Sequence, residues 1–168
     1  MRSGARKTAI VTGASQGIGA GIVKRLLERD FDVVANSRRV TQSTEVEPSD
    51  HVALVDGHIG DPATATKIVE TALSRFGSID VLVNNAGLFF AKPFTDYTAE
   101  DFKLLVSTNV EGFLYVTQLS IKLQDGERPW RASARRELPA SQRTRDETSF
   151  ASHVLLSSGG TVSETSCW

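Results

Sequence analysis

Glycines at a spacing suited to phosphate binding are the most informative chemistry in this chain. They are Gly13, Gly17 and Gly19, within the segment TGASQGIG. A glycine has no Cβ, so the chain can turn tightly there and a pyrophosphate can approach the backbone. The first N–H groups of a helix that follows carry partial positive charge and bind anions. The spacing therefore predicts a nucleotide-phosphate site, and the alternative is a plain glycine turn.

Two arginines, Arg38 and Arg39, follow a second apolar run that ends at Asn36. In a dinucleotide-binding fold, a site that prefers NAD has an acid at the end of the second strand, and this acid accepts hydrogen bonds from the ribose hydroxyls. A guanidinium instead suits a 2′-phosphate, to which it donates charge-assisted hydrogen bonds. We therefore predict a preference for NADP(H), with Ser37 and Arg38 holding the phosphate. The alternative is a solvated pair of arginines at the end of a strand.

The glycines stand between a strand and a helix, which is the context that a dinucleotide site requires. The apolar run from Thr8 to Val11 predicts a buried strand. Residues 20–29 follow with apolar side chains at helical spacing.

Strands and helices alternate through the rest of the first 122 residues. We expect further strands at 31–36, 51–56 and 79–83, a polar loop with a short helical turn at 37–50, and helices at 63–76, 99–107 and 109–123. Asp61 is a candidate N-cap of the helix at 63–76, and Gly77 ends it. Nearly continuous apolar strands alternating with helices indicate an α/β fold, a doubly wound parallel sheet of the Rossmann type. Residues 1–122 would form this NADP(H)-binding domain.

The character of the sequence changes after Lys122. Residues 124–150 contain no lysine and scatter arginine among serine, glutamate and proline. A disordered insert, a basic surface loop, and a change of reading frame or splicing near Leu123 all fit this change. We expect residues 123–168 to be a divergent, irregular tail with a fifth strand at 153–158. The sheet would then be truncated or altered on its carboxyl-terminal side.

The overall composition argues against several classes of protein. The formal net charge is −1, so nothing favours nucleic acid as a partner. The apolar runs are too short to cross a membrane. The single cysteine, Cys167, cannot form an internal disulfide, and the three histidines have no metal-binding spacing. We expect a cytoplasmic protein without a metal site.

These segments together resemble the short-chain dehydrogenase/reductase family over roughly residues 7–121. The matching signatures are TGASQGIG, Asn84 to Gly87, Asn109 to Gly112 and, weakly, Val154 to Ser158. The resemblance implies an oxidoreductase that moves hydride between a nicotinamide cofactor and a small carbonyl or alcohol substrate. With the phosphate prediction above, the cofactor-binding residues are expected to be Gly13, Ser15, Gln16, Gly17, Ile18, Gly19, Ser37, Arg38, Asn85, Ala86 and Gly87.

The catalytic set that the family resemblance implies is only partly present. The family uses a tyrosine, a lysine four residues later, a serine and an asparagine. Asn109 matches the asparagine and Ser158 is the candidate serine. Asn109 could instead be a helix N-cap, and Ser158 an accidental match. The two tyrosines are followed four residues later by aspartate and leucine, so the chain has no tyrosine–lysine pair. Losing the proton donor costs about 10²–10⁴ in rate.

Three interpretations of this chain remain open from the sequence. The first is the NADP(H)-dependent oxidoreductase, and the second is a non-catalytic nucleotide-binding or dimerising fragment of such an enzyme. The third is a product too incomplete to fold. In this family the helix near 109–123 is commonly a dimer contact, so homo-oligomer formation through it is one expectation, and packing in the domain's own core is the other.

One position departs from the family pattern at the adenine. The family usually has an aspartate where His58 stands, and its carboxylate accepts a hydrogen bond from the adenine amine. A neutral imidazole could accept such a bond and a protonated one could not. The alternative is a surface histidine without this role.

Overall fold

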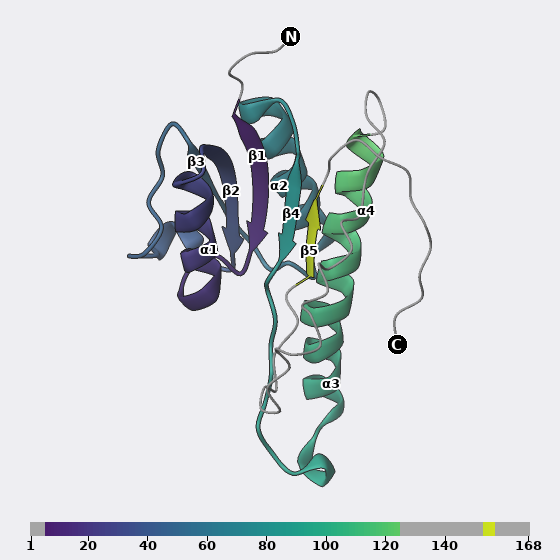
Figure 1. Ribbon diagram of the computed structural model, residues 1–168. Coiled ribbons are helices and arrows are strands. Elements are labelled where there is room, and N and C mark those ends of the chain that lie inside the picture. Colours follow the sequence, from purple (N-terminus) through teal and green to yellow (C-terminus); the bar gives the residue numbers. More distant parts are fainter. Residues whose placement is uncertain (1–5, 125–152, 157–168) are drawn as a thin grey trace, which may run out of the picture.

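The chain folds into a sheet with helices on both faces, as the computed structural model shows for residues 6–124 and 153–156 (Figure 1). The strands lie in the order β3-β2-β1-β4-β5. The first four are parallel: β1 (Lys7–Thr12), β2 (Phe31–Ser37), β3 (Val52–Asp56) and β4 (Val81–Asn84). Their carboxyl ends meet at one edge of the sheet. The predicted Rossmann-type α/β fold is confirmed.

The last strand differs from the expectation. β5 (His153–Leu156) covers the described part of the predicted 153–158 and runs antiparallel to β4, with Val81 opposite Leu156. In either direction the strand would supply hydrogen-bond partners to the outer edge of β4. A short apolar run does not encode strand direction, so the sequence could not decide between them.

The two faces of the sheet carry separate apolar clusters. α1 (Gly17–Leu27) covers one face, and α2 (Pro62–Phe76) and α4 (Gly112–Gln124) cover the other. As predicted, the Asp61 side chain accepts the Ala63 N–H at the start of α2, and Gly77 ends it with a φ of 80°. The cores of the two clusters are fully buried valine, isoleucine, leucine and alanine side chains from the strands and the helices that cover them, including Val11, Val33, Ile10, Ile68 and Leu82.

The connection from β2 to β3 carries only a short helical turn, η1 (Val40–Gln42), as expected. Val40 and Val46 from this connection are buried in the same cluster as α1. The connection is therefore fixed to the core, although it lacks a full helix.

The predicted helices at 99–107 and 109–123 form one continuous helix. α3 (Ala99–Val106) passes through a π-helical turn, η3 (Ser107–Glu111), directly into α4. The backbone angles of Val106 and Gly112, which flank the turn, are helical. Asn109 is therefore not an N-cap, and that alternative is wrong. π-turns inside helices occur frequently at functional sites.

The long helix leaves many apolar side chains exposed. Gly112, Val116 and Ser120 form its buried stripe, whereas Val110 and Leu114 are exposed. A short 3₁₀ turn, η2 (Phe94–Asp96), lies in the segment that precedes α3, and Phe94 there is 91% exposed. No helix within residues 6–124 is long and apolar enough to cross a membrane.

Candidate functional site

Close packing around the turn after β1 requires glycine at two positions. Gly13 has a φ of +66°, and a Cβ on it would lie 2.8 Å from Ala86 Cα. A Cβ on Gly19 would lie 2.2 Å from the carbonyl oxygen of Gly13. The first turn of α1 thus packs directly on the glycine turn, as the glycine spacing predicts.

The segment after β4 locks this turn in place. The Thr12 hydroxyl accepts the N–H groups of Asn85 at 3.1 Å and Ala86 at 3.0 Å. The Asn85 amide donates to the carbonyls of Thr12 and Gly13 at 3.0 and 3.1 Å. The side chain of Asn85 therefore positions the glycine turn and does not itself line the pocket described below.

The amino end of α1 is prepared for an anion. Gln16 is the N-cap and its side chain makes no capping hydrogen bond, and the first turn contains no acidic residue. The N–H groups of Gly17, Ile18 and Gly19 have no partner within the helix, as in any first helical turn. With the helix dipole, they form a site of partial positive charge.

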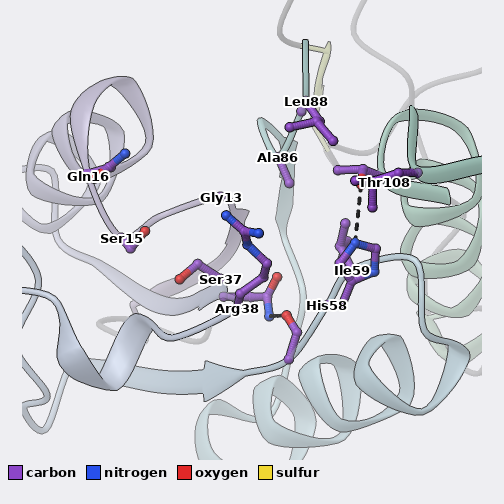
Figure 2. A pocket seen from close by; sticks show the side chains of 14 residues that line it. Gly13, Ser15, Gln16, Ser37, Arg38, His58, Ile59, Ala86, Leu88 and Thr108 are labelled. Atoms are coloured by element: carbon purple, nitrogen blue, oxygen red, sulfur yellow. Dashed lines mark hydrogen bonds between the residues drawn. The ribbon is translucent and has the colours of Figure 1, made fainter. Parts of the chain in front are cut away.

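A cavity of about 190 Å³ opens at the carboxyl ends of the strands beside this turn (Figure 2). It is smaller than a complete small-molecule site, at roughly 300–1,000 Å³. Seven of the predicted cofactor residues line it: Gly13, Ser15, Gln16, Ser37, Arg38, Ala86 and Gly87. Gly17, Ile18, Gly19 and Asn85 do not line it.

Sequence reasoning missed several residues of the pocket wall. Besides His58, the wall contains Asn36, Gly57, Ile59, Leu88, Leu104 and Thr108, which were not predicted to line a site. Asn36 is the informative one, because its Oδ1 atom is buried without a hydrogen-bond partner within residues 6–124. An unpaired buried acceptor is costly, so this atom fits a ligand or water donor. The polar ends of β2 and β3 are the sequence signal that could have found it.

Arg38 lies between the two sides of the pocket in Figure 2, with Ser15 and Gln16 on one side and Leu88 and Thr108 on the other. Its side chain is exposed and forms no ion pair with any carboxylate in the described part of the chain. The guanidinium is therefore available to an anionic ligand.

Both ring nitrogens of His58 are engaged within the protein. Nδ1 accepts the Gly60 N–H at 3.2 Å, which assigns the proton of a neutral ring to Nε2. Nε2 then donates to the Thr108 hydroxyl at 3.2 Å, the contact drawn dashed in Figure 2. The one lone pair of the neutral ring is thus occupied and is not free for an adenine amine in this conformation. His58 instead joins the end of β3 to the π-turn of the long helix.

Asn109 fixes the segment that follows β4. Its Oδ1 accepts the Leu88 N–H at 2.8 Å, and its Nδ2 donates to the Leu88 carbonyl at 2.9 Å. This pair of bonds places Leu88 at the pocket. The second catalytic candidate, Ser158, lies outside the described residues.

Neither tyrosine reaches the pocket. The Tyr97 hydroxyl donates to the Phe90 carbonyl at 2.5 Å, and Tyr115 packs on the apolar cluster under α2 and α4. Lys92 lies over the Tyr97 ring, 5.0 Å from its centroid, and pairs with Asp101. These contacts hold the segment before α3 against the helix.

The stability of the start of α3 is expected to depend on pH through Asp101. The Lys92 ammonium, with the N–H and hydroxyl of Thr98, lowers the pKa of Asp101 to about 2, from 3.8. Because the folded value is the lower one, the stabilisation is fully present above pH about 4 and is lost as pH falls to about 2. Urea unfolding across this window should show the loss in the unmodified chain.

Asp101→Asn is the control for this loss. The variant should be less stable than the unmodified chain at neutral pH, and the difference should shrink towards pH 2. A difference that stays constant with pH would contradict the assignment.

Comparison with known proteins agrees with this geometry. The family model for short chain dehydrogenases matches residues 7–128. An NADP-dependent (R)-specific alcohol dehydrogenase from Lentilactobacillus kefiri is 33% identical over 120 residues, which cover 69% of this chain and 48% of that protein. An L-2,3-butanediol dehydrogenase from Corynebacterium glutamicum is 34% identical over 126 residues, 71% of this chain and 49% of that protein.

Solved structures give the same result. A 3-ketoacyl-(acyl-carrier-protein) reductase from Brucella melitensis, complexed with NADH, superimposes with a TM-score of 0.62 at 34% identity, over 69% of this chain and 49% of that one. The chain therefore belongs to the short-chain dehydrogenase family. It spans about half the length of the curated relatives that it matches.

Proposed function

We propose that this chain binds NADP(H) at the pocket between the glycine turn and Arg38, as the cofactor-binding part of a short-chain dehydrogenase-type oxidoreductase. In this proposal, residues 1–122 form the NADP(H)-binding domain, and the protein is located in the cytoplasm. The bound cofactor would supply hydride to a small carbonyl substrate, or accept it from an alcohol. The observation that carries the proposal is an arginine with no ion pair among the described residues, beside a glycine turn whose helix end is open to an anion.

Each predicted residue has a specific part in this proposal. The amides of Gly17, Ile18 and Gly19 would bind the pyrophosphate, with Ser15 and Gln16 beside them. Ser37 and Arg38 would bind the 2′-phosphate. Gly13, Asn85, Ala86 and Gly87 keep the turn and the end of β4 in place. One relative is NADP-dependent by its name and another was solved with NADH, so the preference rests on Arg38 and not on the relatives.

A second candidate function is a non-catalytic nucleotide-binding or dimerising chain. It is favoured by the lack of a tyrosine followed four residues later by lysine anywhere in the 168 residues. Two exposed apolar positions of the long helix, Val110 and Leu114, fit a contact between two copies. Asn109 and Ser158 remain the catalytic candidates of the first proposal.

Titration with NADPH, followed by its fluorescence, tests binding, and oxidation of NADPH with a panel of ketones tests turnover. We expect binding, with oxidation at least about 10²-fold slower than in a family member that has the tyrosine–lysine pair. Oxidation that Asn109→Ala slows would favour the enzyme. Binding without oxidation, unchanged in Asn109→Ala, would favour the second candidate, and no binding would contradict both.

A further inference from the structure

Asp56 lies at the carboxyl end of β3, directly opposite Ser37 on β2. Its two carboxylate oxygens are both used by one residue. Oδ1 accepts the Thr41 N–H at 2.9 Å and Oδ2 accepts the Thr41 hydroxyl at 2.5 Å. These hydrogen bonds lower the pKa of Asp56 below its ordinary value, so the group is fully charged at neutral pH.

The segment that carries Arg38 is fixed at both ends. On the sheet side, the Gly57 N–H donates to the Ser37 carbonyl at 3.0 Å. On the other side, the Ser43 hydroxyl donates to the Ser15 carbonyl at 2.6 Å, which ties the segment to the glycine turn. Thr41 and its bond to Asp56 lie between these two points.

An ion pair between Arg38 and Asp56 would be expected, because the two residues stand at the ends of neighbouring strands. Asp56 is the acid at the end of the neighbouring strand, and Arg38 directly follows Ser37, the partner of Asp56 in the strand register. The structure shows no such ion pair within residues 6–124. Thr41 binds both oxygens of the carboxylate and so fixes its orientation, and Arg38 forms no ion pair with it in the described part of the chain.

We propose that Thr41 is a positioning residue that determines cofactor specificity: it holds the Asp56 carboxylate away from Arg38, so that the guanidinium can bind a phosphate on the adenosine ribose. This inference rests on the proposed function. It adds that the preference for a 2′-phosphate depends on a threonine outside the pocket wall and on the charge of Asp56.

The test compares Thr41→Val, which removes the hydroxyl at nearly constant volume, with Thr41→Ser, which keeps it. Calorimetric titrations with NADP⁺ and NAD⁺ give the ratio of the two affinities. In Thr41→Val we expect NADP⁺ binding to weaken by about threefold to tenfold, the size of one exposed hydrogen bond or ion pair. NAD⁺ binding should not change, and Thr41→Ser should behave as the unmodified chain.

The double variant Thr41→Val with Asp56→Asn separates this account from a merely structural role. Without the carboxylate nothing competes for Arg38, so NADP⁺ binding should return to at least its original affinity. A ratio unchanged in Thr41→Val, equal weakening of both ligands, or failure of the double variant to restore NADP⁺ binding would overturn the inference. If Thr41→Val does not fold, Thr41→Ala replaces it, and the same ratio of NADP⁺ to NAD⁺ affinity is measured.

Failure of the proposed function gives a different result. If the unmodified chain binds NADP⁺ no more tightly than NAD⁺, then the proposed cofactor is wrong, and the inference is overturned with it. If the unmodified chain prefers NADP⁺ and the Thr41 variants leave that preference intact, then only the inference is overturned.

Discussion

Arg38→Asp is expected to reverse the proposed cofactor preference, because it replaces the guanidinium that we propose binds the 2′-phosphate with the acid that a ribose hydroxyl prefers. Charge-assisted hydrogen bonds contribute about 1.5–3 kcal/mol, so NADP⁺ affinity should fall by at least about tenfold. NAD⁺ affinity should stay the same or rise. Competitive titration of the two dinucleotides measures the ratio directly.

Arg39→Asp is the matched control, since it makes the same change of charge one residue further along the chain. Arg39 is exposed and does not line the pocket, so its effect should be a small, salt-sensitive weakening. Equal effects of the two substitutions would mean that general electrostatic attraction sets the preference. If the ratio of NADP⁺ to NAD⁺ affinity did not change in Arg38→Asp, then Arg38 would not be part of the phosphate site.

Gly19→Ala is expected to destabilise the protein and to abolish nucleotide binding. The new methyl group would lie 2.2 Å from the Gly13 carbonyl oxygen and 2.7 Å from the Asn85 amide nitrogen. Relief requires α1 to move away from the glycine turn, which disrupts the anion site. Overpacking of this kind costs about 1–3 kcal/mol or more, and thermal unfolding with NADPH titration measures both effects.

Gly21→Ala lies in the same helix and supplies the control. A Cβ there meets nothing within 4 Å, and alanine is favoured over glycine in a helix by about 0.5–1 kcal/mol. This variant should be slightly more stable and should bind NADPH as the unmodified chain does. If both variants behaved alike, the close approach at Gly19 would not matter for stability or for NADPH binding.

Local signals in the sequence were sufficient for most of the parallel sheet and its helices. The strand–turn–helix around Gly13 and the Asp61 cap both depend on residues within a few positions of one another. Their physical cause is backbone conformation and capping, which short stretches of sequence encode. The continuous helix through Asn109 was not predicted, because the π-turn keeps helical backbone angles across a segment that had been interpreted as a helix start.

The sequence did not predict the contacts between segments that are far apart in the chain. The bond between His58 and Thr108 joins residues 50 positions apart, and Asn85 positions a turn 72 residues away. The buried stripe of α4 was not predicted either: Gly112 and Ser120 face the core, while Leu114 is exposed. Small side chains are buried there because α4 packs closely on Ile59 and α2, which the apolar pattern does not reveal.

The most direct test of the account is a titration of the ¹⁵N-labelled chain with NADP⁺, followed amide by amide. The account predicts saturable shifts at the amides of Gln16 to Gly19, where the pyrophosphate would bind, and at Arg38. Amides of the helix end far from the pocket, such as Arg75, should not move. Saturable shifts confined to other parts of the chain, or no shifts at all, would contradict it.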